Sequence, residues 1–509
     1  NNRFGLNSMS FSNSNYKFKD VVRTGSLELN SNFGRFSNQF IATFSKIQAT
    51  RSIDGAYFPT VDIFNNNGQN YMSAGSDPFT RNNDVKNDVF NVTNNFTYYA
   101  GKHTITAGAS YEYQRVGNMF MPGSASYYAF NSLDDFINNR APAAFSYTFS
   151  LDPAKPSVYA ADLKVGQLGI YAQDEFNVNE NLKLTYGVRI DKVLYPEAPL
   201  ENPNVTALSF PDRNGVPTNY KTSEWPKQST LYFSPRIGFR YKIDEENLVF
   251  RGGTGLFTGR IPFVYLTNMP SNSQMYQASQ AVTNPAQLGN FNPNPDAYRG
   301  SFSPVAGVLP NNANIVLMDR EFKFPQVWRT NLAVDKKLGN GWSITAEALI
   351  TKDINAVIMR NANQLNPNAR LTDGNDTRPR YAATGDRRLY SNIGSAIVLE
   401  NASRGNSGSF TVQVTKTSSK GFFGTLAYTR SYATELTSNP GSQATSTWQS
   451  NPTTATQNDQ QLFNSAYVAP HRLISTISYK FSYGKNLATT FTLFGELAKG
   501  NNYSYTVNG

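Results

Sequence analysis

Residues 231–257 alternate between apolar and polar side chains with a period of two. Ile237 and Phe239 share one parity with other apolar residues, whereas Arg236 and Arg240 occupy the other. Successive side chains of a strand point to opposite faces, so this stretch predicts a hairpin with one apolar and one cationic face. A strand between lipid and a watery lumen needs that pattern over about 9–11 residues. A transmembrane β-barrel is favoured at this point, and a soluble β protein is the alternative. In a barrel, Ile237 and Phe239 face lipid and the two arginines face the lumen.

Six further hairpins of this kind bring the expected number of strands to about fourteen. The short turns of all seven hairpins lie at residues 34–35, 100–103, 179–181, 244–247, 339–341, 418–421 and 484–486. Long polar stretches separate them, at residues 46–87, 115–165, 192–228, 258–325, 353–407 and 431–470. Strict alternation of short and long connections is typical of a closed up-and-down barrel, whereas structureless loops this long are rare in soluble domains. The sequence therefore predicts an all-β protein, a transmembrane antiparallel up-and-down β-barrel. Its long loops are extracellular and have no recognisable fold.

The same pattern predicts sidedness. Residues near the short turns are expected on the periplasmic side, namely Lys102, Glu180, Glu245, Asn340, Lys420 and Lys485. Residues within the long loops are expected outside the cell, namely Asp152, Trp225, Asn284, Asp373 and Ser446.

Composition agrees with a membrane barrel. The chain has no cysteine, 29 Tyr and 35 Phe, and no window approaches 18 consecutive apolar residues. Aromatic residues near strand ends suit the lipid–water boundary. Lys and Arg exceed Asp and Glu by ten, but they are scattered and form no long basic run. This distribution argues against nucleic-acid binding. It favours lumen lining and contact with outer-membrane lipid and lipopolysaccharide.

The sequence offers little for catalysis. With no cysteine and two histidines, and without a Gly-x-Ser-x-Gly or His-Glu-x-x-His motif, an enzyme is not expected. His103 and His471 are read as lacking nearby carboxylate partners, and the segment 373–376 lacks EF-hand spacing. The glycines of 252–259 lie within a strand and do not form a phosphate loop. No catalytic residue, metal or cofactor is predicted.

Two groups of residues are candidates for contacting a transported compound. On the lumenal parity lie the cations Arg189, Arg236, Arg240, Lys242, Arg251 and Arg329. They would pair with carboxylates of a plug or set the anion preference of an open pore. In the long loops, aromatic faces and guanidinium groups suit sugars, peptides and carboxylates. These loop candidates are Tyr127, Tyr128, Phe130, Trp225, Arg260, Tyr265, Tyr276, Arg387, Arg388 and Trp448. Packing of each loop onto its neighbours is the alternative role.

Seven short segments, in order along the chain, carry a family resemblance. They are residues 24–31 (TGSLELNS), 169–176 (GIYAQDEF), 184–189 (LTYGVR), 233–238 (FSPRIG), 251–260 (RGGTGLFTGR), 377–381 (TRPRY) and 469–473 (APHRL). Together they resemble the TonB-dependent outer-membrane receptors of Bacteroidetes-type bacteria, particularly the Oar-like group related to the SusC transporters.

The resemblance implies a 22-stranded barrel closed by an N-terminal plug, in the bacterial outer membrane. The sequence shows no plug, no TonB-contacting segment and no final strand ending in an aromatic residue. Residues 1–509 are therefore expected to be a single, incomplete barrel domain, with the plug and terminal strands outside this chain. It is not expected to close on itself, so the strand near Leu27 should not pair with the one near Leu493.

The resemblance also implies a function. It implies import of a peptide, glycan or chelated nutrient, with TonB contacted through a region outside this chain and a surface lipoprotein as a further partner. Two alternatives remain open at this point. One is a passive porin-like channel, and the other is a structural barrel in a surface or secretion complex.

Overall fold

The computed structural model describes residues 9–65, 67–282, 290–298, 301, 305–372, 374–382 and 384–503. Its largest sheet has 15 strands, of which 14 follow one another in chain order. These 14 strands are β2 (Lys17–Phe33), β3 (Phe36–Ser52), β6 (Asn83–Ala100), β7 (His103–Phe120), β10 (Ala161–Asn177), β11 (Leu182–Leu194), β14 (Leu231–Ile243), β15 (Leu248–Thr258), β18 (Gln326–Gly339), β19 (Trp342–Asp353), β24 (Asn406–Thr417), β25 (Phe422–Glu435), β27 (His471–Tyr483) and β28 (Leu487–Ala498). The short β26 (Phe463–Asn464) pairs only with β25.

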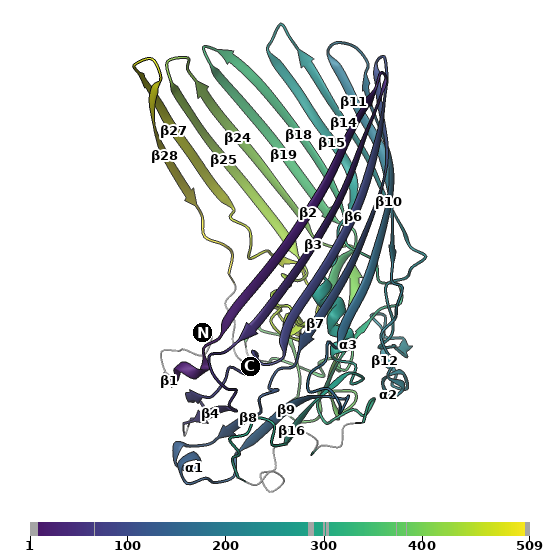
Figure 1. Cartoon of the computed structure of the whole chain (residues 1–509), viewed down its shortest axis with the longest axis vertical. Coiled ribbons are helices and arrows are strands. Elements are labelled where there is room, and N and C mark those ends of the chain that lie inside the picture. Colours follow the sequence, from purple (N-terminus) through teal and green to yellow (C-terminus); the bar gives the residue numbers. More distant parts are fainter. Residues whose placement is uncertain are drawn as a thin grey trace.

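The fourteen strands form one curved antiparallel sheet, with the short hairpin turns at one end and the long connections at the other (Figure 1). This arrangement confirms the predicted all-β up-and-down architecture. The strands nevertheless extend further toward the long connections than the apolar alternation predicts. β6 begins at Asn83, although alternation begins at Val89, and β7 continues to Phe120. The extra residues of β6 are mostly polar and carry no hydrophobic period, whereas those of β7 include Val116, which packs in an apolar core.

The two faces of the sheet differ as predicted. Ile237 and Phe239 on β14 are 54% and 38% exposed on one face, which we call the outward face. Arg236 and Arg240 alternate with them and lie on the inner face. In the strand register Arg240 pairs with Arg251 of β15, and Ser234 pairs with Arg189 of β11. Directly paired residues of antiparallel strands project to the same face. These four of the predicted lumenal cations therefore share the inner face, and Arg329 joins them because it pairs with Gly255, the partner of Arg236.

The order of strands runs from β2 to β28, and within the described residues these two strands pair with neighbours on one side only. Leu27 of β2 pairs with Ala42, and Leu493 of β28 pairs with Ile477. Neither strand is hydrogen-bonded to the other in the part of the chain that the structure describes.

The expectation that the long loops have no recognisable fold is wrong. Their described residues form a folded body, which we call the loop module. One sheet has the order β1-β5-β4-β8-β9-β16, with β1 (Met9–Ser10), β5 (Asn70–Ala74), β4 (Thr60–Phe64), β8 (Tyr127–Phe130), β9 (Ala144–Ser150) and β16 (Gln277–Val282). A second sheet joins β17 (Ala313–Met318), β23 (Ile393–Ala402) and β20 (Ala356–Asn361). Two short pairs are β12 (Phe210–Pro211) with β13 (Pro217–Thr218), and β21 (Ala369–Arg370) with β22 (Pro379–Arg380).

The helices of the loop module are short. They are η1 (Ser12–Ser14), α1 (Leu133–Ile137), α2 (Pro203–Thr206), α3 (Phe263–Ser271) and α4 (Ala444–Gln449). No described helix has the length and apolar character needed to cross a membrane. Positions 284 and 373, which the sequence analysis places outside the cell, lie outside the described residues.

The loop module is held to the barrel sheet by an apolar core. Val116, Leu163 and Val193 lie at the loop ends of β7, β10 and β11, on the same parity as the inner-face residues. Leu266 and Met269 of α3 pack against them and are fully buried. Part of the chain between β15 and β18 thus folds back over the inner face. At the loop ends of these strands the inner face is therefore apolar, and the polar lining predicted for the inner face does not extend to this end.

Candidate ligand sites in the loop module and on the inner face

A polar hollow of about 390 Å³ brings together three of the predicted loop candidates, Arg387, Arg388 and Trp448. They come from the segment before β23 and from α4, about 60 residues apart in the sequence. The remaining lining is dominated by amides. The lining residues are Asn312, Asn314, Asn361, Gln364, Arg387, Arg388, Gly394, Ser395, Trp448 and Gln449. We call this hollow the amide–arginine pocket.

Arg388 is held in place by two neighbours. Its Nε donates to Asp386 Oδ1 at 2.9 Å, and one terminal nitrogen donates to Asn312 Oδ1 at 2.9 Å. The hydrogen bond from Arg388 lowers the pKa of Asp386, so this carboxylate stays ionised at neutral pH. Arg387 lies over the ring of Tyr381, with 5.2 Å between its guanidinium carbon and the ring centroid. Both guanidinium groups are therefore oriented before any ligand arrives, which lowers the entropy cost of binding.

The wall of the pocket is fixed by packing and hydrogen bonds. Trp448 is 9% exposed and its Nε1 donates to Asn458 Oδ1 at 2.9 Å. The side chain of Asn458 also bonds the backbone N–H and carbonyl of Asn361 at 2.8 and 2.9 Å. At Gly394, a Cβ atom would lie 2.7 Å from the carbonyl oxygen of Asn312, so a side chain there would push the two strands apart.

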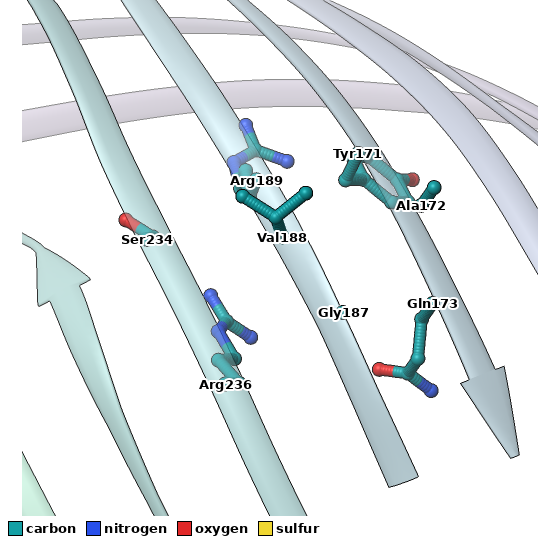
Figure 2. Close-up of a pocket in the computed structure, with 8 residues that line it drawn as sticks. All are labelled: Tyr171, Ala172, Gln173, Gly187, Val188, Arg189, Ser234 and Arg236. Carbon is teal, nitrogen blue, oxygen red and sulfur yellow. The ribbon is translucent and has the colours of Figure 1, made fainter.

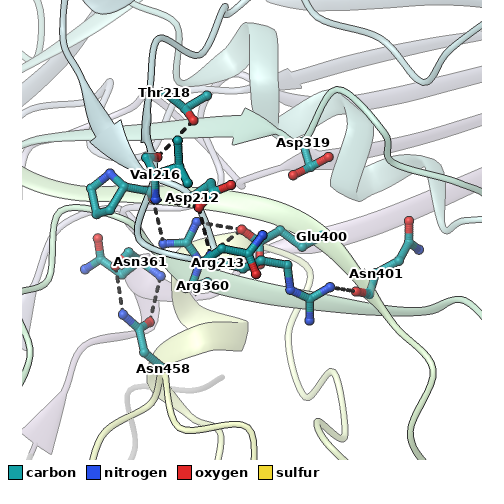
Figure 3. A network of polar contacts seen from close by, with 12 residues as sticks. Asp212, Arg213, Val216, Thr218, Asp319, Arg360, Asn361, Glu400, Asn401 and Asn458 are labelled. Atoms are coloured by element: carbon teal, nitrogen blue, oxygen red, sulfur yellow. Dashed lines mark hydrogen bonds and ion pairs between the residues drawn. The ribbon is translucent and has the colours of Figure 1, made fainter.

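A second hollow of about 480 Å³ shares Gln364 with the amide–arginine pocket. Its lining includes Arg213, Arg360 and Asn458 (Figure 3). Arg213 is exposed and donates to the carbonyl oxygen of Asn401 at 2.6 Å. Burial raises the pKa of the nearby Tyr220 hydroxyl to about 12. The two hollows together offer guanidinium and amide groups, and the second hollow also carries the carboxylate of Asp212.

A buried ion pair supports this wall. Arg360 on β20 donates to Oε1 of Glu400 on β23 at 2.6 and 2.9 Å, and Glu400 is 1% exposed (Figure 3). A further nitrogen of Arg360 donates to the carbonyl oxygen of Pro211 at 3.0 Å. The other oxygen of Glu400 is buried without a hydrogen-bond partner among the described residues. Arg360 therefore supplies nearly all of the interactions that offset the cost of burying the Glu400 carboxylate.

Several predicted ligand candidates pack the loop module instead. Tyr128, Phe130 and Tyr265 are buried, at 0%, 0% and 4% exposure, and they present no open aromatic face in this structure. The alternative packing role weighed from the sequence holds for these three. Their apolar rings stabilise the module by filling its cores.

The other candidates are tethered near the module's surface. Tyr127 donates to Asp62 Oδ2 at 3.0 Å, and the Tyr276 hydroxyl accepts the N–H of Leu200 at 2.9 Å. Trp225 stacks on Tyr195 with ring centroids 5.4 Å apart, and its Nε1 donates to the Glu197 carbonyl. Arg260 forms an ion pair with Glu112 of β7 at 2.6 Å. A ligand role for these residues stays a prediction.

A third hollow, of about 410 Å³, lies on the barrel sheet between β10, β11 and β14 (Figure 2). Arg189, Arg236, Ser234 and Tyr171 contribute to it. At Gly187 in its floor, a Cβ atom would lie 2.6 Å from a backbone oxygen of β10, so the strands approach closely there.

The inner-face arginines differ in their partners. Arg189 donates to Asp191, and Arg251 pairs with Asp335 at 2.9 Å and Glu347 at 3.3 Å. Arg236 stacks on Phe257 instead. Within the described residues, neither Arg236 nor Arg240 has a carboxylate within ion-pair distance, so both remain open to an anionic partner.

The expectation that His103 lacks a carboxylate partner is wrong. Its Nδ1 lies 2.7 Å from Asp174 Oδ2, and Tyr186 donates to the same oxygen at 2.7 Å. The partner is 71 residues away in the sequence, and only the pairing of β7 with β10 brings it close. His471 contacts Tyr428 and Arg430. Among the described residues, no group of three or more acidic or histidine side chains is arranged to hold a metal ion.

The amides of the amide–arginine pocket were not predicted from the sequence. Asn312, Asn314 and Gln364 lie in polar, Asn-rich segments where nothing distinguishes a lining amide from a solvated one. The flanking apolar run Ile315–Met318 would have predicted a buried strand, and with it a fixed position for Asn314.

Comparison with known proteins places these features in context. A sequence model described as "Outer membrane beta barrel domain" matches residues 6–507. No curated protein sequence matches. The matched family is one of membrane barrels, in agreement with the expectation that the chain is not an enzyme.

A solved structure of an outer-membrane transporter shares the fold. The outer membrane transporter YddB from Escherichia coli is similar with a TM-score of 0.55 and 11% identity, over 92% of this chain and 49% of that one. A mutant of the ferric enterobactin receptor PfeA from Pseudomonas aeruginosa has a TM-score of 0.49 and 11% sequence identity. The match covers 97% of this chain and 52% of that one. The FrpB iron transporter from Neisseria meningitidis has a TM-score of 0.48 and 9% sequence identity. The match covers 94% of this chain and 51% of that one. The chain thus spans about half the length of these transporters.

Proposed function

Because this chain belongs to the family of outer membrane beta-barrel domains, we propose that it is the larger part of the barrel of an outer-membrane nutrient importer. The observation that carries this proposal is the amide–arginine pocket, which the folded loop module builds at the end of the sheet where ligands would arrive. A porin needs only a lumen. A preorganised polar pocket built from β17, β20, α4 and the segment before β23 is a feature of a receptor that selects its ligand.

The lining suggests the class of compound. Two oriented guanidinium groups favour carboxylates, and five amides favour hydroxyl and peptide groups. The compound is accordingly an acidic peptide, an acidic glycan or a chelated nutrient that carries carboxylates. The similarity to the outer membrane transporter YddB is in keeping with transport and does not fix the substrate.

We further propose that the barrel is completed by strands outside this chain and that a plug and a TonB-contacting segment belong to the same protein. Among the described residues, β2 and β28 each have one side without a partner strand, which supports this because unpaired backbone groups in hydrocarbon cost several kcal/mol each. The inner-face cations Arg236 and Arg240, which have no carboxylate within ion-pair distance in the described part of the chain, would suit carboxylates of such a plug. The Oar-like and SusC-related assignment and a surface lipoprotein partner remain parts of this proposal.

Binding to the purified protein tests the pocket. A panel of acidic oligopeptides, acidic and neutral oligosaccharides and ferric chelates is titrated calorimetrically against the wild type and an Arg387→Gln/Arg388→Gln variant. Losing charge-assisted hydrogen bonds of about 1.5–3 kcal/mol each should weaken binding of an acidic ligand at least about tenfold. Arg378→Gln is the matched control, because Arg378 pairs with Asp376 in a neighbouring loop and does not line the pocket.

Uptake separates the importer from a passive channel. Cells that lack TonB should fail to accumulate the compound identified by titration. Accumulation that continues at the wild-type rate without TonB would favour the porin-like alternative. Equal affinity of the double variant and the wild type would remove the pocket from the proposal.

A further inference from the structure

Five charged side chains stand in one row across the outward face of β2, β3, β6, β7 and β10. In the strand register Arg23 pairs with Lys46, Lys46 with Asp88, Asp88 with Arg115, and Arg115 with Lys164. Paired residues on neighbouring antiparallel strands project to the same face. The row is therefore continuous over five strands, and four of its five members are cations. We call it the cationic row.

The residues beside the row identify its level on the barrel. One step closer to the hairpin turns, Phe44, Phe90 and Tyr113 form an aromatic row, and Phe44 and Phe90 are 48% and 44% exposed. Phe90 and Tyr113 lie ten residues from the end of their strands at the turn. At about 3.3 Å per residue and a tilt of about 40°, this places them about 25 Å from the turn. That height equals the apolar band of a membrane barrel, whose upper edge the aromatic row then marks.

The cationic row begins at this edge and rises beyond it. Arg23 lies ten residues from Phe33 and Lys164 lies 13 residues from Asn177, at the turn ends of their strands. The same geometry gives heights of about 25 to 33 Å above the turns. The row therefore stands at the level of lipid headgroups, on the side of the membrane where the loop module lies.

The charge of the row is only partly balanced by protein. Arg115 is bonded to Asp162 at 2.6 and 2.8 Å, and Lys164 pairs with Glu197. Asp88 stands between Lys46 and Arg115. Arg23 and Lys46 are exposed, and neither has a described carboxylate within ion-pair distance. Like charges directly opposite each other destabilise a sheet, so an external anion would stabilise the Arg23–Lys46 pair in addition to Asp88 on the other side of Lys46.

We propose that the cationic row binds phosphate groups of the outer-leaflet lipid. Phosphates are the anions that occur at this level of the bilayer, directly beyond the aromatic edge of the hydrocarbon. A lysine and an arginine side by side offer one point charge and one planar fork of donors to the same phosphate. The site is independent of the amide–arginine pocket, because it lies on the outward face. The site is also confined to one part of the sheet. At the same height on β11 and β19, the outward-facing cations Lys192 and Lys352 pair with the apolar residues Leu168 and Trp328 and not with a second cation.

Lipid binding to the whole protein, purified in detergent, tests the proposal. The probes are phosphorylated lipid A and the same lipid after removal of its phosphates. The wild type should bind the phosphorylated form, and Arg23→Gln/Lys46→Gln should bind it about 30-fold more weakly, at about 1 kcal/mol per cation. Arg23→Lys/Lys46→Arg keeps both charges and should bind within a few-fold of the wild type. Lys192→Gln/Lys352→Gln is the matched control and should bind like the wild type.

Three results would overturn the proposal. They are equal binding of both lipid forms by the wild type, wild-type affinity in the Arg23→Gln/Lys46→Gln variant, and an equal loss in the Lys192→Gln/Lys352→Gln control. Thermal unfolding and heat-modified gel mobility show whether each variant is folded. If the neutral variant does not fold, the ratio of affinities of the wild type for the two lipid forms decides the matter.

Discussion

Arg360→Met is expected to destabilise the loop module by about 3–5 kcal/mol, because it leaves the carboxylate of Glu400 buried without a counter-charge. Glu400 is 1% exposed, and one of its oxygens has no hydrogen-bond partner among the described residues. The module should therefore open locally around β20 and β23, and the amide–arginine pocket beside them should lose its shape. Hydrogen exchange at the amides of these two strands measures the change in opening free energy.

Two further variants separate charge from packing at this site. Arg360→Met combined with Glu400→Met removes both charges and should recover most of the loss, since apolar replacement of a buried pair is often neutral. Arg378→Met breaks the exposed pair with Asp376 and should cost less than about 1 kcal/mol. Exchange rates in Arg360→Met that equal those in Arg378→Met would contradict the assignment of a buried, dependent carboxylate.

Phe239→Arg should destabilise the barrel by about 2–4 kcal/mol in a lipid bilayer. Phe239 lies on the outward face, four residues from the end of β14 at the hairpin turn, which places it about 10 Å into the apolar band. An arginine there must carry its charge through hydrocarbon or thin the bilayer locally. Urea unfolding of the protein reconstituted in lipid vesicles measures the cost.

Thr185→Arg is the matched control for this variant. Thr185 pairs with Gly238, so it stands on the inner face beside Phe239's strand and has room next to a residue without a side chain. Its replacement should change the free energy of unfolding by less than about 1 kcal/mol. Neutrality of Phe239→Arg together with a large cost for Thr185→Arg would show that the two faces of the sheet are assigned the wrong way round.

The barrel sheet could be predicted from the sequence because its rule is local. Alternation over about ten residues and a short polar turn define each hairpin, and neighbouring hairpins pair in chain order. The fourteen strands, their turns and the parity of residues such as Phe239 and Arg236 followed from that rule alone. It failed only at the loop ends, where strands such as β6 continue without an apolar period.

The loop module could not be predicted in the same way because its contacts are distant in sequence. β4 pairs with β8, which is more than 60 residues away in the sequence. Arg360 forms its ion pair with Glu400, which is 40 residues away. Its strands are short and lie among Asn, Ser and Pro residues, so each alone resembles an irregular loop. The prediction of Arg387, Arg388 and Trp448 as loop candidates rested on residue type, and their convergence in one pocket was visible only in three dimensions.

The measurement that tests the account most directly is cysteine labelling in intact cells. The chain has no cysteine, so each introduced thiol is the only one it carries. Single cysteines are placed at Lys102, Glu245 and Asn340 in the hairpin turns and at Asp152, Trp225 and Ser446 in the loop module, then exposed to a membrane-impermeant maleimide. The account predicts labelling at the three loop positions and protection at the three turns until the outer membrane is permeabilised. Labelling at the turns with protection in the loop module would place the amide–arginine pocket in the periplasm and contradict the proposed receptor.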